Sequence, residues 1–515
     1  MNHSQRLFRL SLLIPAAAPT GMAMAKTLPH DKSRPNVIII VADDLGYGDL
    51  ECYGAKNVQT PNVNRLAQHG IRFSNGYAVA ATSTPSRYSL LTGEYAWRRP
   101  DTDVARGDAG LIIRPQQLTM ADVFKSKGYN TCAIGKWHLG LGHATGEQDW
   151  NAPLPAALGD LGFDYHYIMA ATADRVPCVF IENGQVANYD SSSPIEVNYE
   201  RNFEGVPTAK EHPELLYNQR SSHGHDQAIV NGIGRIGYMR GGGKALWKDE
   251  DIADSITAHA INYIRRQGSN PFFMYFATND VHVPRFPHAR FRGKSRMGVR
   301  GDAIAQFDWS VGEIVKQLDR QGILDNTLII LTSDNGAVVD DGYDDQAEEL
   351  LNGHDPSGGL RGNKYSAFEG GTRVPFIISW GRNIPRGIRS DALVSQVDLL
   401  ASLSHLIQAR IPKGCAADSR NHLDAYLGKD TTGRPYVIQQ NNRRVLSVRT
   451  AKWKYIEPSS GEKMISWGPK IETGNLPGPQ LYNLQRNAYE AENVATTHPQ
   501  VVFDMQEILR RERER

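Results

Sequence analysis

The residues best suited to chemistry are a serine and an arginine four positions apart, Ser83 and Arg87, in the segment STPSRYSLLTG at residues 83–93. Pro85 suits the first turn of a helix and Gly93 suits its end, so the segment predicts a helix that begins near Ser83. Ser83 then faces free backbone N–H groups, where an anion is stabilised, and Arg87 adds a fixed positive charge one turn later on the same face. Because serines often begin ordinary helices, the helix alone favours a structural role.

Oxygen donors directly follow two of the predicted strands. The runs NVIIIVA (residues 36–42) and TLIILT (residues 327–332) are apolar and β-branched, which predicts parallel strands buried on both faces. The carboxyl ends of such strands share one edge of the sheet, and ligands bind there. Neighbouring carboxylates repel, so we expect a cation between them, and an all-oxygen set favours Ca²⁺ or Mg²⁺ over Zn²⁺; a solvated turn is the alternative. The donors are Asp43, Asp44, Asp334 and Asn335.

Basic side chains follow two more of the predicted strands. Lys136 and His138 come after a short strand, and their spacing of two puts them on one side of an extended segment. His282 follows the apolar run FFMYFA at residues 272–277, and Lys364 lies in a glycine-rich segment that can project back over the same edge. Each residue alone fits a surface lysine or a packed histidine. Together they suit an anionic substrate.

In this order, these stretches resemble the type I sulfatases. In that family the first residue of the signature C/S-x-P-S-R is converted to Cα-formylglycine, whose hydrate is the nucleophile. Most members carry Cys there and a bacterial branch carries Ser, so Ser83 indicates the serine branch or a replaced cysteine. The resemblance covers residues 35–411. It rests on the motifs RPNVIIIVADDLGYGD, STPSR with LTG, GKWHLG, H-x-P, SDNG and K-x-x-x-x-EGG-x-RVP.

The resemblance implies a metal and a nucleophile. One calcium ion would be held by Asp43, Asp44, Asp334 and Asn335, with the formylglycine at position 83 completing the shell. The ion and Arg87 would acidify the aldehyde hydrate, and Asp334 could take its proton before one hydroxyl attacks sulfur. A sulfatase-maturating enzyme is therefore an expected partner.

The resemblance also implies how charge and protons are handled. Lys136, Lys364 and His282 would neutralise the sulfuryl oxygens, as charge stabilisation in such transfers requires. His282, with Lys364, would protonate the leaving alcohol. His138 would then take the proton of the second hydroxyl, which expels sulfate and restores the aldehyde.

The resemblance implies an α/β fold, alkaline-phosphatase-like, with a mostly parallel central sheet sandwiched by helices. The catalytic domain would span residues 26–411. The sequence changes character near residue 412, where short strands at 436–439, 445–450 and 453–457 and an amphipathic helix from 499 are expected. Residues 412–515 are therefore predicted to form a smaller C-terminal α+β domain with a short antiparallel sheet.

Composition narrows the function classes. A net charge of +1 gives no general attraction to nucleic acid or membranes, and no apolar run is long enough to span a bilayer. Residues 1–25 combine a basic start, a short apolar stretch and an A-x-A cleavage site, which predicts a signal peptide and a periplasmic or secreted protein. The cysteines (Cys52, Cys132, Cys178 and Cys415) lack C-x-x-C spacing, so a zinc site is not expected.

The substrate is expected to be a sulfated saccharide. Residues 151–243 lack clean periodicity and are interpreted as insertions around the site, where specificity resides. Asp174 and Arg175 are predicted to contact sugar hydroxyls, because an Asp–Arg pair makes directional hydrogen bonds to a vicinal diol. Residues 221–226 are read as a plain loop and the acidic run 340–349 as a solvated loop. Similarity in NGIGRIGYM and HDPSG is greatest to galactose and N-acetylgalactosamine 6-sulfatases, which implies an exo-acting glycan sulfatase.

Two other functions stay open at this point. One is a phosphonate or phosphate monoester hydrolase, which shares the fold, the formylglycine and the single calcium ion. The other is a non-catalytic glycan-binding protein, if Ser83 is never modified.

Overall fold

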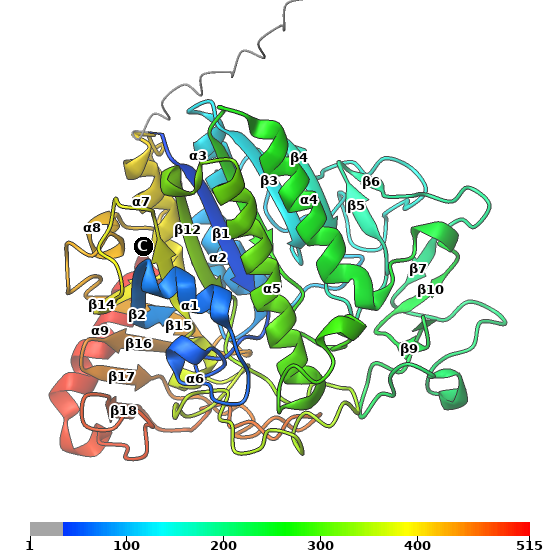
Figure 1. The fold of residues 1–515 in the computed structure, drawn as a ribbon. Coiled ribbons are helices and arrows are strands. Elements are labelled where there is room, and N and C mark those ends of the chain that lie inside the picture. Colours follow the sequence, from blue (N-terminus) through cyan, green and yellow to red (C-terminus); the bar gives the residue numbers. More distant parts are fainter. Residues whose placement is uncertain (1–33) are drawn as a thin grey trace, which may run out of the picture.

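The computed structural model describes residues 34–515, and a ten-stranded sheet lies at its centre (Figure 1). The strand order is β14-β2-β13-β12-β1-β11-β3-β4-β5-β6, and the neighbours from β12 to β4 run parallel. Strand β1 (Asn36–Ala42) is buried at every residue, as expected for a strand covered on both faces. The other parallel strands of this central part are β3 (Asn130–Lys136), β4 (Tyr165–Met169), β11 (Phe272–Ala277) and β12 (Thr327–Ser333).

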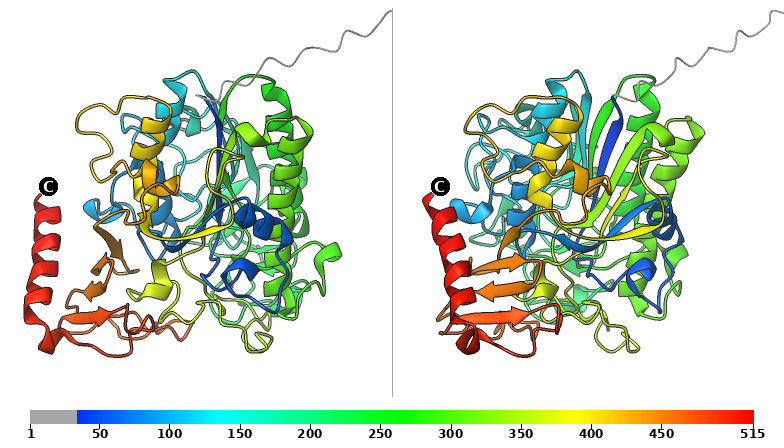
Figure 2. Two further views of the ribbon diagram at one scale, coloured as in Figure 1. Left: turned by 60° about the vertical axis from the view of Figure 1, so that its left-hand side comes forward. Right: turned by 90° about the vertical axis from the view of Figure 1, so that its left-hand side faces the viewer.

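Helices cover both faces of the sheet, which confirms the predicted α/β sandwich (Figures 1 and 2). One layer consists of α1 (Pro61–Gln68), α4 (Ile252–Gln267) and α5 (Gly298–Arg320), and the other of α2 (Ser83–Thr92), α3 (Met120–Lys125) and α7 (Leu399–Leu406). An apolar stripe along α5 is buried against the sheet, with Ile304, Phe307 and Val311 fully enclosed. Two four-residue helices, α6 (Glu369–Thr372) and α8 (Leu423–Tyr426), lie in connections.

The edges of the large sheet are less regular than its centre. Strand β13 (Phe376–Ser379) runs antiparallel to both of its neighbours. Several edge strands were not predicted, because they are short or carry polar residues. The strands outside the parallel core are β2 (Gly70–Tyr77), β5 (Phe180–Glu182), β6 (Gln185–Val186), β13 (Phe376–Ser379) and β14 (Ile388–Ser395).

The insertion after β4 contains little regular structure, as its lack of periodicity indicated. It holds two small two-stranded sheets, β10 with β7 and β8 with β9. Their bounds are β7 (Glu196–Asn198), β8 (Ile229–Val230), β9 (Ile233–Gly234) and β10 (Tyr238–Arg240).

The C-terminal part forms a four-stranded antiparallel sheet with a long helix, α9 (Pro499–Glu514), against it (Figure 2). This confirms the expected small antiparallel sheet and adds a strand, β18, that was not predicted. The apolar side of α9 contacts the sheet through Val502, Met505 and Leu509. The strands are β15 (Tyr436–Gln440), β16 (Leu446–Thr450), β17 (Trp453–Ile456) and β18 (Gln480–Asn483).

Two sequence expectations concern export. The predicted signal peptide, residues 1–25, lies outside the described residues. Within residues 34–515, none of the helices combines the length and apolarity needed to cross a bilayer.

The thiols of Cys52, Cys132, Cys178 and Cys415 are free, and Cys132 is buried.

Candidate active site

The serine lies at the amino end of a buried helix. Helix α2 begins at Ser83 and ends before Gly93, whose left-handed φ of 68° closes it, as predicted. All of its residues are buried, including the guanidinium of Arg87. The Ser83 hydroxyl donates to Asp334 Oδ2 at 2.6 Å and accepts from Arg87 Nε at 2.8 Å. The hydroxyl is therefore fixed between a carboxylate and a cation.

Two buried carboxylates, Asp43 and Asp334, lie next to Ser83 and Arg87. Lys136 Nζ donates to both oxygens of Asp43 at 2.7 Å, and Arg87 Nη2 donates to Asp334 Oδ2 at 2.7 Å. Burial alone would raise the pKa of Asp334, but Arg87 and Lys136 outweigh it and hold that pKa well below its usual range. The pKa of Asp43 is raised, because burial and the neighbouring carboxylates outweigh Lys136. Two cations, Arg87 and Lys136, thus face two carboxylates, Asp43 and Asp334, in this buried part of the site.

A third carboxylate, Asp44, completes the cluster. It accepts from Asn335 Nδ2 and from Lys364 Nζ, each at 2.8 Å, and His282 Nε2 lies 3.7 Å from it. The backbone N–H of Asp44 donates to Asp334 Oδ1 at 3.2 Å, which joins the ends of strands β1 and β12. Residues 290 positions apart in sequence therefore meet at one edge of the sheet.

This set fits a hard divalent cation. It offers three carboxylates, one amide oxygen and the oxygen at position 83, the kind of donors that Ca²⁺ prefers. Oδ1 of Asn335 is buried and has no hydrogen-bond partner among the described residues. A buried acceptor without a partner is unusual, and a metal ligand is one explanation for it. Ligand atoms of Asp43, Asp44 and His282 also lie within 4.8 Å of one another.

His138 lies nearby with one nitrogen available. Its Nε2 lies 2.9 Å from the carbonyl oxygen of Ala105, which can only accept, so Nε2 carries the proton and Nδ1 is the basic nitrogen. Nδ1 is buried and has no partner among residues 34–515. Burial and the charge of Lys136 lower the pKa of His138 well below its usual value, which keeps the ring neutral. The expected extended backbone is wrong at this residue, because His138 has a φ of 59°.

A fourth carboxylate of the site, Asp341, is not predicted from the sequence. We read residues 340–349 as a solvated loop, but Asp341 is buried and accepts from Lys364 Nζ at 3.0 Å and from the Tyr365 hydroxyl at 2.9 Å. Burial lowers the pKa of Lys364, but Asp341 and Asp44 outweigh it and hold that pKa well above its usual range. The predicted solvated loop is wrong at Asp341, because a run of acidic residues does not indicate which of them forms an ion pair with a distant lysine.

Asp174 and Arg175 form a second polar group beside the cluster. Arg175 Nη1 donates to both oxygens of Asp174 at 2.9 Å, and His225 Nε2 lies 2.9 Å from Asp174 Oδ2. Burial would raise the pKa of Asp174, but Arg175, His282 and His225 hold it well below its usual value. His225 belongs to residues 221–226, for which the sequence predicts a plain loop. The histidine-rich sequence at 221–226 was the available signal for it.

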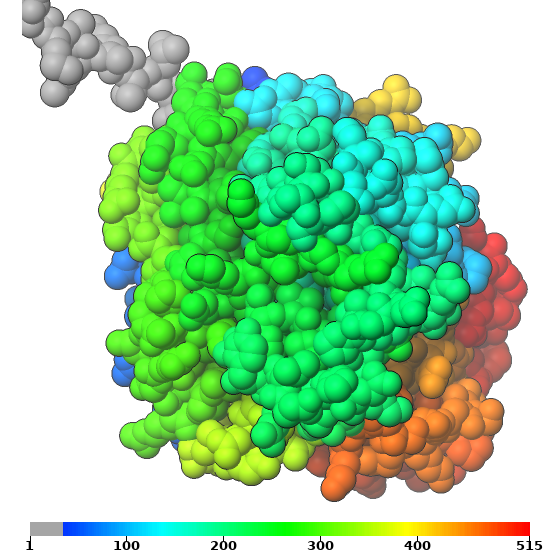
Figure 3. Space-filling model, turned by 90° about the vertical axis from the view of Figure 1, so that its right-hand side faces the viewer, coloured from blue at the N-terminus to red at the C-terminus, as the bar shows by residue number. Residues whose placement is uncertain are grey.

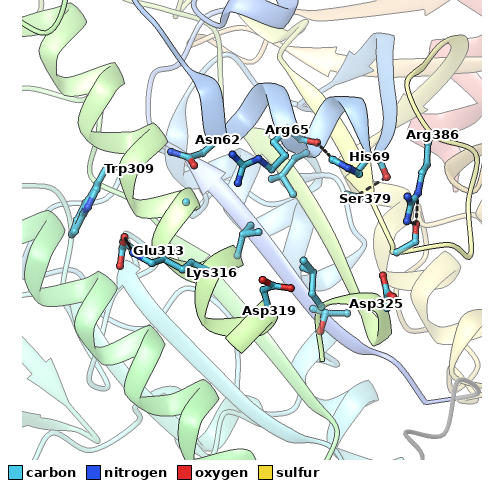
Figure 4. Close-up of a pocket in the computed structure, with 16 residues that line it drawn as sticks. Asn62, Arg65, His69, Trp309, Glu313, Lys316, Asp319, Asp325, Ser379 and Arg386 are labelled. Carbon is cyan, nitrogen blue, oxygen red and sulfur yellow. Dashed lines mark hydrogen bonds and ion pairs between the residues drawn. The ribbon is translucent and has the colours of Figure 1, made fainter. Parts of the chain in front are cut away.

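A cavity of about 570 Å³ elsewhere does not share these features (Figure 4). It lies between helices α1 and α5 and is lined by exposed charged residues such as Arg65, Lys316 and Asp319. Thr327, where β12 begins, lines it, whereas Asp334 follows the end of β12. At about 3.3 Å per residue, the cavity and the carboxylate cluster are roughly 20 Å apart along that strand.

Comparison with known proteins gives consistent matches. The family model described as Sulfatase matches residues 35–409. An N-acetylgalactosamine-6-O-sulfatase of Bacteroides thetaiotaomicron is 49% identical over 509 residues, covering 99% of each chain, and human steryl-sulfatase is 31% identical over 78% of this chain and 71% of its own. A solved protein of B. thetaiotaomicron, described in connection with the metabolism of multiple glycosaminoglycans, superposes with a TM-score of 0.92. It is 51% identical and covers 94% of this chain and all of its own.

Proposed function

The chain belongs to the sulfatase family of sulfuric ester hydrolases, and from that premise we propose that it removes sulfate from carbohydrates. We propose an exo-acting enzyme whose substrate carries a 6-O-sulfated N-acetylgalactosamine or galactose. The observation that carries this proposal is 49% identity, over 99% of both chains, to an N-acetylgalactosamine-6-O-sulfatase.

The metal in this proposal is one calcium ion. Its ligands would be Asp43, Asp44, Asp334, Asn335 and the oxygen at position 83. When bound, such an ion withdraws electrons from the oxygens it contacts and offsets negative charge. The all-oxygen donor set and the unpartnered Asn335 Oδ1 support this assignment.

The nucleophile would be position 83 after conversion of Ser83 to formylglycine by a sulfatase-maturating enzyme. Asp334 Oδ2, 2.6 Å from the Ser83 oxygen, is the base nearest to the attacking hydroxyl. Arg87 donates to both residues and fixes their geometry. An unmodified serine has no second hydroxyl, so it could be sulfated once but could not release sulfate by this route.

Two lysines and a histidine would surround the sulfate ester. Lys136, Lys364 and His282 converge on the carboxylate cluster, where the two ammonium groups can neutralise the sulfuryl oxygens and His282 lies beside them. Lys364, whose pKa is raised, keeps its charge, while burial and the two lysines lower the pKa of His282. His282 Nδ1 lies 2.6 Å from the Val283 carbonyl oxygen, so Nδ1 is protonated and Nε2 is the nitrogen that faces the site. We propose that Nε2 takes a proton from the charged Lys364 and passes it to the oxygen of the leaving alcohol.

His138 and the Asp174–Arg175 pair would complete the reaction and the recognition of the sugar. His138 Nδ1, basic and unpartnered, would take the proton of the second hydroxyl and expel sulfate. Asp174 and Arg175 would bind sugar hydroxyls, supported by the burial of Asp174 beside His282 and by the partial exposure of Arg175. We further propose export to the periplasm or the medium, on the signal peptide expected at residues 1–25.

Two measurements test this function. Mass spectrometry of the peptide containing residue 83, from protein made with a maturating enzyme, should show the loss of two hydrogens from serine. The same protein should release sulfate from a 6-sulfated N-acetylgalactosamine or galactose in a panel of singly sulfated monosaccharides, with aryl phosphate and phosphonate esters assayed in parallel. Faster hydrolysis of the phosphorus esters would instead favour a phosphate or phosphonate hydrolase. An unmodified serine in the native organism would favour a glycan-binding protein.

A further inference from the structure

A hairpin from the C-terminal part reaches the edge of the candidate active site. Its two sides pair through Ile465 N–H to Ile471 O at 2.9 Å and Thr473 N–H to Lys463 O at 3.0 Å. Glu472 on this hairpin forms an ion pair with Arg361 at 2.8 Å. The hairpin is therefore tied to the segment that carries Lys364, although about a hundred residues separate them in sequence.

The base of the hairpin is buried, but its tip exposes a tryptophan. Ile465 and Ile471 belong to one buried apolar cluster with Val338 and Tyr365. Trp467, between them in sequence, is 47% exposed. Its ring centre lies 5.2 Å from that of Tyr365, with the ring planes at 77°. A large indole is thus held in position by a buried neighbour while part of its surface stays open to solvent.

Trp467 lies between Tyr365 and His223, which belong to two different segments near the site. On one side, its neighbour Tyr365 donates to Asp341, which in turn accepts from Lys364. On the other side, the Trp467 ring lies 6.4 Å from the ring of His223, two residues before the His225 that contacts Asp174. The tryptophan is therefore linked to Lys364 through Tyr365 and Asp341, and it contacts the loop that carries His225.

The loops around Trp467 are fixed to one another by hydrogen bonds. Ser222 Oγ donates to Asp340 Oδ1 at 3.1 Å, and its backbone N–H donates to the Gly342 carbonyl at 3.0 Å. In Figure 3 the green insertion, the yellow-green segment near residue 350 and the orange C-terminal segment border one another on one face. The rim near Trp467 is therefore built from three parts of the chain.

We propose that Trp467 is a stacking platform for the saccharide unit next to the sulfated sugar. This inference rests on the proposed function. A pyranose ring has an apolar face of C–H groups. When this face packs on an aromatic ring, both surfaces are removed from contact with water, which favours binding. With the sulfated unit held between Lys364 and Asp174, the unit attached to it leaves the site past the rim. Trp467 is the large apolar side chain exposed at the hairpin tip that forms part of this rim.

The test compares one sulfated unit alone and within a chain. Wild type, Trp467→Ala and Trp467→Phe, each carrying formylglycine, are assayed on a 6-sulfated monosaccharide and on an oligosaccharide with the same unit at its non-reducing end. We expect Trp467→Ala to lower kcat/KM on the oligosaccharide about tenfold, mainly through KM, and at least fivefold more than on the monosaccharide. Trp467→Phe should retain most of the preference.

Phe503→Ala is the matched control, because Phe503 is 56% exposed on α9 and belongs to no part of the site. It should change neither substrate. An equal loss on both substrates for Trp467→Ala would indicate a structural role and overturn the proposal, as would no loss on either.

If the wild type hydrolyses no sulfated sugar, the proposed function has failed. Calorimetric titration of the same proteins with the uncleaved oligosaccharide then decides the platform separately. A loss of affinity in Trp467→Ala supports it, and equal affinity or no binding to either protein overturns it.

Discussion

At the scale of single residues, two buried atoms of the site have no hydrogen-bond partner within residues 34–515, although each is well placed for a role in the reaction. Nδ1 of His138 and Oδ1 of Asn335 are both buried and have no hydrogen-bond partner among the described residues. Leaving such a group unpaired costs about 1–3 kcal/mol, and a bound ligand or a transferred proton would offset that cost. The two atoms suggest two different uses, a base and a metal ligand.

The first prediction concerns the base. In formylglycine-bearing His138→Gln, we expect one equivalent of alcohol to appear rapidly, followed by a steady rate that is reduced about 10²- to 10⁴-fold. The reason is that attack on sulfur does not need His138, whereas release of sulfate does. Stopped-flow measurement of an aryl sulfate, with parallel assay of free sulfate, checks this. Loss of the initial burst together with the steady rate would show that His138 acts before sulfate transfer.

The second prediction concerns the metal ligand. Calcium added to the chelator-treated protein should raise its Tm, because an ion that binds only the folded state stabilises it by mass action. Asn335→Leu, which keeps the branched shape but removes the oxygen, should reduce this calcium-dependent rise to a small fraction. Differential scanning calorimetry measures the effect without any activity assay. An unchanged rise would exclude Asn335 from the metal shell, and Asn383→Leu, on an exposed loop, is the control.

At the scale of elements, the central strands could be predicted because their environment is uniform. β1, β11 and β12 are buried along their whole length, so their sequences are continuous apolar runs. β14 has exposed residues at its start and a register shift, and the C-terminal strand β18 is only four residues long. Short or half-exposed strands are stabilised mainly by their neighbours, and no local pattern reports those neighbours.

The same contrast applies to the candidate site. Asp43, Asp44 and Asp334 directly follow buried strands, so their convergence could be predicted from topology. Asp341 and His225 lie in loops whose positions are set by tertiary contacts, such as the Ser222–Gly342 hydrogen bond. Only the structure could bring them to Lys364 and Asp174.

The third prediction concerns the contact between the loop after β1 and helix α5. Asp49, fully buried, accepts from Arg300 at 2.8 and 2.7 Å and contacts His354 at 2.8 Å. Burial raises the pKa of Asp49, but Arg300 and His354 outweigh it and lower that pKa from 3.8 to about 2. Asp49→Asn leaves Arg300 buried without a counter-charge, so it should reduce the free energy of unfolding by about 3–5 kcal/mol near neutral pH.

The pH dependence of this loss gives a second check. A lowered pKa in the folded state contributes stability above the unfolded pKa of 3.8, and that contribution is lost as the pH falls towards about 2. The difference between wild type and Asp49→Asn should therefore narrow by about 1 kcal/mol between neutral pH and pH ~3. Urea titrations at both pH values measure it. A constant difference would show that the pair does not depend on the charge of Asp49.

At the scale of the whole molecule, the predicted boundary at residue 412 does not separate two independent contact networks. Gln440, at the end of β15, exchanges hydrogen bonds with Val79 and Ala81 at 3.0 and 2.9 Å, just before the serine helix. Val79 and Tyr95 lie in the same buried cluster as the C-terminal sheet. Glu369, in α6, is fully buried and forms an ion pair with Lys454 of β17 at 3.2 Å. The C-terminal sheet therefore holds the segment that leads into helix α2 and Ser83.

The last prediction is that residues 412–515 cannot be removed. Deletion would expose Val79 and Tyr95, each worth about 1.5–3 kcal/mol when buried, and would leave Glu369 without the cation of Lys454. Losses of this size approach the whole stability of a typical domain, so we expect the truncated chain to be insoluble or unfolded. Calorimetry of the full chain should accordingly show one cooperative transition. A truncated protein that unfolds cooperatively and still gains thermal stability from calcium would mean that residues 26–411 form an independent domain. In that case the support for Ser83 must come from the central sheet and helix α2 alone.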